Sequence, residues 1–517
     1  MTLQIAFVLI VIVGMIAALA KDKMRPGMIL LTAVVCFLCA GILSPKEMLE
    51  GFSNKGMITV AMLFLVSEGI RQSGTLEQLI RKLLPLKDTT VLKAQVRILP
   101  IIAFISAFLN NTPVVVIFAP IIKHWAEQVK LPATKFLIPL SFVTILGGMC
   151  TLIGTSTNLV VHGMILEAGF PGFTMFELGK VGIFIAVAGI IYLFCFSGKL
   201  LPDSRPLSEP EEEDSENSEK LHRIEAVLGA RFPGINKTLA TFNFQRHYGA
   251  EVKEIKKRNG QNITKDIDKV RLQEGDTLVL MADDSFIPTW GESSVFVLLV
   301  NGNDPERMTK KKRWIALILL VLMIVGATVG ELPAVKEAFP HLKLDMFFFV
   351  SVTTVIMAWL RIFPARKYTK YISWDILITI ACAFAVSKAI VNSGLSSLIA
   401  HYIIELSRNG NPYILLAALF IITNLFTEFI TNNAAAALAF PLALSISSQL
   451  GVSPTPFFVV ICMAASASFS TPIGYQTNLI VQSIGNYKFT DFIRIGLPLN
   501  IITFLISVFV TPLIWPF

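Results

Sequence analysis

The stretch "FLNNTPVVVIFAP", residues 108–120, places Asn110, Asn111 and Thr112 in a row inside a long apolar segment. A related stretch, "EFITNNAAAALAFP" at 428–441, repeats the pattern some three hundred residues later. Amide and hydroxyl side chains are costly in hydrocarbon unless they are paired or line a polar cavity. The two stretches therefore need a surrounding structure that uses them, and this need decides the fold.

The composition identifies that surrounding structure as a membrane domain. Of the 517 residues, 54% are hydrophobic and only 15% are charged, whereas soluble domains carry about 25% charged residues. The apolar residues come in runs of about 17 to 25, which match a bilayer core of roughly 30 Å. The net charge of +8 is spread over the loops, and the positive-inside rule explains it better than a nucleic-acid partner does. We expect an all-α polytopic membrane protein that binds no nucleic acid.

The apolar runs divide into complete spans and two longer blocks. Complete spans are expected near residues 3–20, 27–43, 57–72, 134–166, 178–200, 313–330, 345–363, 374–392, 454–482 and 494–515. The blocks 95–128 and 411–447 each hold one Asn-rich stretch at the middle, as a re-entrant hairpin of two half-length helices with a polar tip would. Non-helical backbone is tolerated at membrane depth only where it lines a cavity or packs in protein.

An internal repeat supports this division. "SEGIRQSGTL" at 67–76 resembles "SKAIVNSGLS" at 387–396, and "GTSTNLVV" from Gly154 resembles "GYQTNLIV" from Gly474, both at an offset of 320 residues. The two Asn-rich stretches match at an offset of 321. Each half holds five spans and a hairpin, an odd number, so the halves must have opposite orientations. Inverted repeats of this kind are typical of secondary transporters with a binding site at the midplane.

A segment of different character separates the halves. The first membrane repeat covers 1–201, an acidic linker 202–218, a small α+β domain 219–302, and the second repeat 313–517. Within the small domain we expect strands in 222–230, 249–260, 276–282 and 293–301, with one short helix over 237–249. The alternation of loop charges places this domain in the cytoplasm.

Each hairpin tip is paired with a polar, glycine-containing break in a later span. "LGGMCTLIGTSTNLV" interrupts 134–166, and "SASFSTPIGYQTNLIV" interrupts 454–482. Unwinding exposes carbonyl oxygens that hold a cation, while N–H groups at half-helix N-termini attract an anion. Neutral donors are added by Thr112, Thr155, Ser156, Asn433 and Thr477. The tips contain no Lys or Arg, so an oxyanion held there can also be released.

Two structural interpretations of these polar residues stay open. A single Ser, Thr or Asn in a membrane helix is usually interhelical glue, although four clusters in two related pairs favour a binding site. Glu428, on the same helical face as Asn432, either couples protons or bonds free backbone amides, and we favour the structural role. The sequence shows no Walker A loop, no nucleotide-binding glycine motif and no GxSxG elbow, so we do not expect an enzyme.

The motifs resemble those of a known family. "SAFLNNTPVV" and "TEFITNNAAAALAFP" are similar to the paired Ser-Asn-Thr hairpin motifs of the divalent anion:sodium symporters, and "LIGTSTNLVV" and "STPIGYQTNLIV" to their unwound-helix motifs. The exact forms most resemble the branch of bacterial and algal sulfate permeases. The insert from "RFPGINKTLATFNFQRHYG" to "DTLVLMA" is similar to one copy of the C-terminal RCK (TrkA-C) regulatory module.

The resemblance implies a homodimer that works by an elevator motion, with membrane lipid around it. It implies a sodium site, carried over by position to Asn110, Asn111, Gly154, Thr431, Asn432 and Gly474. It implies an anion site at Asn111, Thr112, Thr155, Ser156, Asn432, Asn433, Thr471 and Thr477. The RCK-like module implies a possible nucleotide ligand such as cyclic di-AMP. Three positions depart from the family pattern, because Asn110 and Thr431 replace Ser and Asn433 replaces Thr.

We therefore expect a multi-pass protein of the inner (plasma) membrane that imports a small divalent anion together with sodium, sulfate first. Asn433 narrows the pocket and suits a compact tetrahedral anion better than a four-carbon diacid. A sodium-coupled dicarboxylate or citrate carrier is the alternative. A channel or sensor gated by the RCK-like module is the alternative from a different class.

Overall fold

The computed structural model describes most of the chain. The described residues are 3–21, 24–85, 89–203, 222–229, 232–257, 261–264, 266–282, 286, 290, 295–300, 309–339, 341–406 and 411–517. Nearly all of the predicted acidic linker, from 204 onward, lies outside them.

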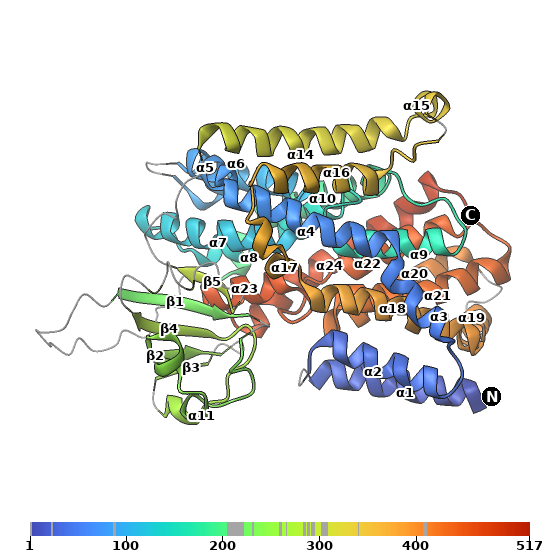
Figure 1. The fold of residues 1–517 in the computed structure, drawn as a ribbon, viewed down its shortest axis with the longest axis horizontal. Coiled ribbons are helices and arrows are strands. Elements are labelled where there is room, and N and C mark those ends of the chain that lie inside the picture. The colour runs from blue at the N-terminus through green and yellow to red at the C-terminus, as the bar shows by residue number, and fades with distance from the viewer. Residues whose placement is uncertain are drawn as a thin grey trace, which may run out of the picture.

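In the described part of the first half, ten α-helices follow one another. They are α1 (Leu3–Lys21), α2 (Pro26–Cys39), α3 (Pro45–Glu50), α4 (Lys55–Ser73), α5 (Thr75–Leu83), α6 (Val91–Ser106), α7 (Asn111–Gln128), α8 (Thr134–Gly148), α9 (Ser156–Glu167) and α10 (Gly179–Leu200). The hairpin is α6–α7, and α8–α9 is the predicted span with a break (Figure 1).

The second half repeats this order. Its helices are α14 (Lys310–Gly330), α15 (Pro333–Ala338), α16 (Met346–Trp359), α17 (Tyr368–Tyr371), α18 (Trp374–Asn392), α19 (Leu395–Leu406), α20 (Pro412–Phe429), α21 (Asn432–Leu450), α22 (Thr455–Ser466), α23 (Gln476–Gly485) and α24 (Phe489–Ile514). Here α20–α21 is the hairpin and α22–α23 the broken span. The predicted all-α polytopic class with a small α+β insertion is confirmed.

Seven helical segments of the described chain are long and apolar enough to cross a membrane. They are Pro45–Ser73, Gly179–Leu200, Lys310–Gly330, Trp374–Asn392, Pro412–Phe429, Asn432–Leu450 and Phe489–Ile514. Two of them, α20 and α21, are hairpin arms of 18 and 19 residues, or about 27 Å each at 1.5 Å per residue. By length alone each arm could cross a bilayer, and the hairpin that they form over 412–450 lies close to the predicted block 411–447. Each arm packs on a neighbouring helix, α20 on α22 and α21 on α18.

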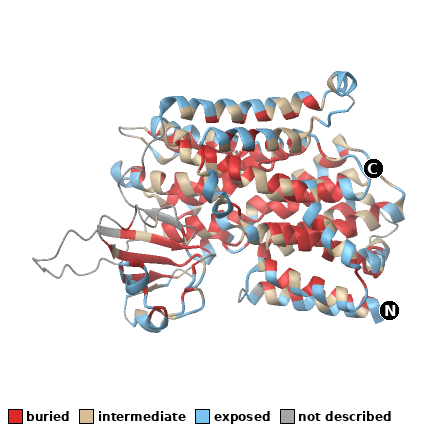
Figure 2. Ribbon diagram, in the orientation of Figure 1, coloured by how far each residue is buried: buried red, intermediate tan, exposed pale blue. Residues whose placement is uncertain are grey.

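Burial separates lipid-facing helices from central ones (Figure 2). On α24, Ile493, Leu497, Ile501, Leu505 and Phe509 are all exposed and recur every four residues, which puts them on one face. An apolar stripe of this kind is costly in water and suits hydrocarbon. By contrast every residue of α8 is buried, and so is every residue of α22 except the first. The two broken spans thus start inside the protein.

Helices of the two halves pack against each other in reciprocal pairs. The second arm of the first hairpin, α7, packs against α23, the second part of the other half's broken span. In the same way α21 packs against α9. This reciprocal packing brings both hairpin tips and both breaks to the centre of the membrane domain.

The inserted domain is built on a five-stranded antiparallel sheet of order β3-β2-β4-β1-β5. The strands are β1 (His222–Leu228), β2 (Glu251–Lys256), β3 (Asn262–Ile263), β4 (Thr277–Ala282) and β5 (Phe296–Val300). The four predicted strands are found, and β3 was missed because two residues carry no alternation. The single predicted helix is two, α11 (Leu239–Phe242) and α12 (Phe244–Tyr248), because Asn243 adopts φ +48° between them.

This sheet sits against the membrane helices that carry the site (Figure 1). Glu225 of β1 lies 3.5 Å from the Lys123 ammonium of α7 and 3.0 Å from that of Lys256 on β2. Thr277 of β4 is hydrogen-bonded to Ser483 of α23. Burial raises the pKa of Glu225, but the two ammonium groups outweigh it and hold the pKa below its ordinary value.

Candidate functional site

Four helices begin at the two tips and the two breaks and direct their N-termini into the centre. The helices α7, α9, α21 and α23 follow the N-cap residues Asn110, Thr155, Thr431 and Tyr475. None of these four side chains makes a capping hydrogen bond to its own helix. The first backbone N–H groups of a helix have no partner within it and carry the positive end of the helix dipole. The two tips and the two breaks therefore present donors and partial positive charge to an anion without using a cationic side chain.

In the first half, the polar side chains of the hairpin hold the broken span in place. Ser106, at the end of α6, donates to the Thr144 carbonyl of α8 at 2.9 Å and lies 2.8 Å from Asn111 Oδ1. Asn158 of α9 reaches back and donates to the Thr151 carbonyl at 2.9 Å. These bonds satisfy backbone groups that unwinding leaves free, so the break is a stable feature of the fold.

The second half repeats this pattern. Thr427 donates to the Ala465 carbonyl at 2.6 Å and lies 2.8 Å from Asn432 Oδ1. Asn478 donates to the Thr471 carbonyl at 3.1 Å. The polar residues of the sequence repeat thus perform the same structural task twice, which explains why two apolar segments tolerate them.

Glycine is required where the chain crosses itself. A Cβ on Gly148 would lie 2.7 Å from Asn111 Oδ1, and one on Gly154 would lie 2.6 Å from the Gly148 carbonyl oxygen. A Cβ on Gly474 would lie 2.0 Å from Ser468 Oγ and 2.5 Å from the Thr427 carbonyl oxygen. Real Cβ atoms do not approach other atoms so closely. Gly154 and Gly474, both predicted in the sodium site, therefore allow the breaks to pack against the hairpins.

A nest of oxygen atoms surrounds Asn111 in the first half. The amide atom that faces away from the centre lies 2.8 Å from Ser106 Oγ, 2.8 Å from the Thr144 carbonyl oxygen and 3.3 Å from the Gly154 carbonyl oxygen. Hard cations take neutral carbonyl, amide and hydroxyl oxygens as ligands, and unwound transporter helices supply such oxygens to sodium. The donor set can hold a hard cation, and it includes Asn111 and Gly154, two of the residues expected in the sodium site.

Tyr475 stands where the two halves meet. Its hydroxyl lies 2.6 Å from Asn111 Nδ2 and 3.1 Å from Thr155 Oγ1, and it also bonds the Asn432 side chain. Both hairpin tips and the first break therefore touch one phenol. The sequence reasoning did not single out Tyr475. The offset of 320 residues was the missed signal, because it makes Tyr475 the counterpart of Thr155.

Further pairs cross between the halves near this phenol. Thr112 Oγ1 lies 3.4 Å from Gln476 Oε1, and Ser156 Oγ lies 3.3 Å from Asn433 Oδ1. By offset, Thr112 corresponds to Asn433 and Ser156 to Gln476, so the two pairs are equivalent. The structure thus brings together six of the eight predicted anion-site residues: Asn111, Thr112, Thr155, Ser156, Asn432 and Asn433.

The remaining predicted residues are placed differently. Thr477 is fully buried and its hydroxyl accepts from Ser141 of α8 at 2.9 Å, so it links two helices. Thr471 donates to the Glu428 carbonyl at 2.9 Å and faces the hairpin. In the part of the chain that the structure describes, the buried hydroxyl of Thr431 has no hydrogen-bond partner. Asn110 faces a hollow on the side of α4.

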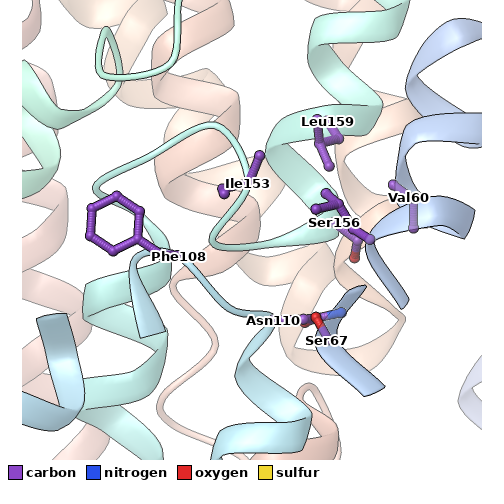
Figure 3. Close-up of a pocket in the computed structure, with 8 residues that line it drawn as sticks. Val60, Ser67, Phe108, Asn110, Ile153, Ser156 and Leu159 are labelled. Atoms are coloured by element: carbon purple, nitrogen blue, oxygen red, sulfur yellow. The ribbon is translucent and has the colours of Figure 1, made fainter. Parts of the chain in front are cut away.

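That hollow is lined from α4, the first tip and the first break (Figure 3). Val60, Leu63 and Ser67 come from α4, and Leu159 from α9. The polar groups that face it are Ser67, Asn110 and Ser156. One wall thus belongs to a helix outside the hairpins and broken spans.

Glu428 bonds the second break. Its carboxylate accepts from the backbone N–H groups of Ser470 and Thr471 at 2.9 and 2.8 Å, and from Asn500 Nδ2 at 2.7 Å. These are the contacts of the structural alternative, in which the carboxylate satisfies amides that unwinding has freed. The first half has Ala107 at the matching position.

Inverted halves, paired hairpins and broken helices around a polar centre define a secondary membrane transporter. The family described as citrate transporter matches residues 7–447 and 342–516. The chain therefore belongs to the citrate transporter family, whose members are transporters rather than enzymes.

Relatives agree with this class. An uncharacterised transporter of Synechocystis sp. is 28% identical over 99% of this chain and 97% of its own length. A putative sulfur deprivation response regulator of Chlamydomonas reinhardtii is 27% identical over 93% of this chain and 96% of its own length. Sodium/sulfate cotransporter 2 of the same alga is 30% identical over 290 residues, or 56% of this chain and 32% of that protein.

Proposed function

We propose that this protein imports sulfate together with sodium. One observation carries the proposal: four helix N-termini without side-chain caps come together at two tips and two breaks whose sequences contain no Lys or Arg. Such a site binds an oxyanion through backbone and neutral donors and can release it. The oxygen nest at Asn111 supports a cation beside it, and the sodium/sulfate cotransporter relatives support this pairing of ions.

The two ions are expected to assist each other electrostatically. A cation in the nest adds positive charge next to the anion, and a bound anion in turn favours the cation. The linkage is reciprocal, so each must raise the affinity of the other by the same factor. An elevator motion in a homodimer of the plasma (inner) membrane is the transport mechanism we propose, with the inserted domain as a cytoplasmic RCK-like regulatory module that binds a nucleotide.

Uptake by reconstituted protein tests this proposal. Proteoliposomes with an inward sodium gradient should accumulate labelled sulfate, and those with an equal potassium or choline gradient should not. The purified protein should show a higher melting temperature with sodium and sulfate together than with either alone, because only ligands of the folded state stabilise it. Uptake at the same rate without sodium would overturn the coupling.

Citrate or a dicarboxylate is the second candidate substrate, and the family match favours citrate. If excess citrate or succinate competes with labelled sulfate and is itself accumulated, that carboxylate replaces sulfate as the proposed substrate. If neither citrate nor succinate competes, sulfate remains the proposed substrate.

A further inference from the structure

We propose that the Tyr475 hydroxyl links the two ion sites, by donating its hydrogen toward the anion only when the Asn111 amide has turned its oxygen to a cation. Tyr475 is then a positioning residue of the second half that responds to cation binding in the first. This inference rests on the proposed sodium coupling and adds the group that transmits it.

Two orientations of the Asn111 amide fit the same space. In one, Oδ1 faces Ser106 Oγ at 2.8 Å and Nδ2 donates to the Tyr475 hydroxyl at 2.6 Å. In the other, Nδ2 donates to Ser106 Oγ, to the Thr144 carbonyl at 2.8 Å and to the Gly154 carbonyl at 3.3 Å, while Oδ1 accepts from the Tyr475 hydroxyl. Without a cation the second orientation is better satisfied, because the first points an amide oxygen at carbonyl oxygens.

A cation in the nest reverses this preference. Sodium needs oxygen lone pairs, so the amide must turn Oδ1 toward Ser106, Thr144 and Gly154. Nδ2 then donates to the Tyr475 oxygen, which becomes an acceptor in that contact. A hydroxyl has one hydrogen, so the hydrogen that bonded Asn111 becomes available to another acceptor. Thr155 Oγ1 at 3.1 Å or an anion at the centre can receive it.

The ring makes this response specific to one half. Tyr475 extends from the second break to Asn111 and Thr155 of the first half, whereas its counterpart by offset, Thr155, is too short to reach the opposite tip in the same way. Tyr475 also bonds Asn432 of its own half, but Thr155 does not extend from the first break to the second tip as Tyr475 extends to the first. The first-half nest is the one whose occupancy should control anion affinity most strongly.

Replacing Tyr475 by Phe removes the hydroxyl and keeps the ring. Sulfate dissociation constants are to be measured by calorimetry in saturating sodium and in choline. In the wild type, sodium should tighten sulfate binding at least tenfold. In Tyr475→Phe the tightening of sulfate binding by sodium should fall toward onefold.

Tyr192→Phe is the matched control. It also removes one buried tyrosine hydroxyl of the membrane domain, the one that donates to the Ile495 carbonyl at 3.0 Å between α10 and α24. It should keep the full sodium effect. A merely structural role of Tyr475 would lower stability in both variants and leave the sodium effect unchanged in both.

The outcomes separate the inference from the proposed function. No sodium effect in the wild type overturns the proposed coupling. A full sodium effect in both wild type and Tyr475→Phe overturns this inference alone. If Tyr475→Phe does not fold, fluorotyrosine placed at 475 retains the hydroxyl, and sodium without sulfate should shift its fluorine NMR signal. An unchanged signal at 475 overturns the inference, and fluorotyrosine at 192 is the control.

Discussion

Gly474 shows how little space single residues leave at the breaks. Gly474→Ala would place a Cβ within 2.5 Å of two oxygen atoms, one of them a backbone carbonyl, so the break must move away from the hairpin. We expect a loss of about 1–3 kcal/mol in stability, as for other overpacked sites, and loss of stabilisation by sodium and sulfate in thermal melts. Gly198→Ala is the control, because nothing lies within 4 Å of its Cβ; it should melt as the wild type or slightly higher.

Glu428 separates a structural from a proton-coupling role. Glu428→Gln replaces one acceptor oxygen by an NH₂ group that faces the donors of Ser470, Thr471 and Asn500. Leaving buried donors unsatisfied costs about 1–3 kcal/mol, so the melting temperature should fall while the pH dependence of uptake stays as in wild type. Glu405→Gln, at an exposed acid of α19, should change neither. An altered pH profile with unchanged stability would establish proton coupling.

The side chains of the site were predictable to different degrees. Asn111, Thr112, Asn432 and Asn433 were found from sequence because a polar group in an apolar run is conspicuous. Tyr475 was not, because a tyrosine in a membrane segment is unremarkable by composition. Thr477 was expected to face the anion, yet a helix turns its neighbours about 100° apart, and Thr477 faces Ser141 instead.

The four helix N-termini make the site an arrangement of elements more than of side chains. Thr112 stands at the second position of α7 and is partly exposed. Thr112→Asp should keep or raise stability, because an acid near a helix N-terminus contributes about 0.3–1 kcal/mol. The added negative charge should nevertheless weaken sulfate binding at least tenfold in calorimetry. Thr112→Asn, of nearly equal size and no charge, is the control; equal weakening by both would show that the helix dipole is not the source of affinity.

The helices themselves were predicted in type and order, and less well in extent. Long apolar runs identify spans because only a helix satisfies every backbone group in lipid. The short helices α5 and α19 were missed, since their mixed polar and apolar residues produce no long apolar run. The two hairpins were predicted over 95–128 and 411–447 and lie over 91–128 and 412–450, because apolar blocks give the position of a hairpin but not its ends.

At the scale of the whole molecule, one ion-pair cluster joins the inserted sheet to the membrane domain. Glu225→Gln would leave the nearly buried Lys256 ammonium without its carboxylate and weaken the contact to Lys123. Removing one partner of a buried pair costs a few kcal/mol, so amide hydrogen exchange in β1 and α7 should accelerate at neutral pH. Lys253→Gln, in an exposed pair with Glu251, should have no such effect.

The pH dependence of this contact follows from the lowered pKa of Glu225. A carboxyl whose pKa is lower in the folded state stabilises that state above its ordinary value near 4.5, and the contribution is lost as pH falls through the lowered value. The sheet should therefore stay bound to the membrane helices across the neutral pH range. The melting temperatures of wild type and Glu225→Gln should become equal only at acid pH. Convergence already near pH 7 would contradict this assignment.

The sheet rests on α7 and α23, which carry a hairpin tip and a break, while the next helix, α14, packs on α4 and α16. If the hairpins and broken spans slide past α4 during transport, the sheet moves with them and α14 keeps its place beside α4. The chain that joins the sheet to α14 would then set an upper limit on this movement, and shortening that chain should stop transport before the movement is complete.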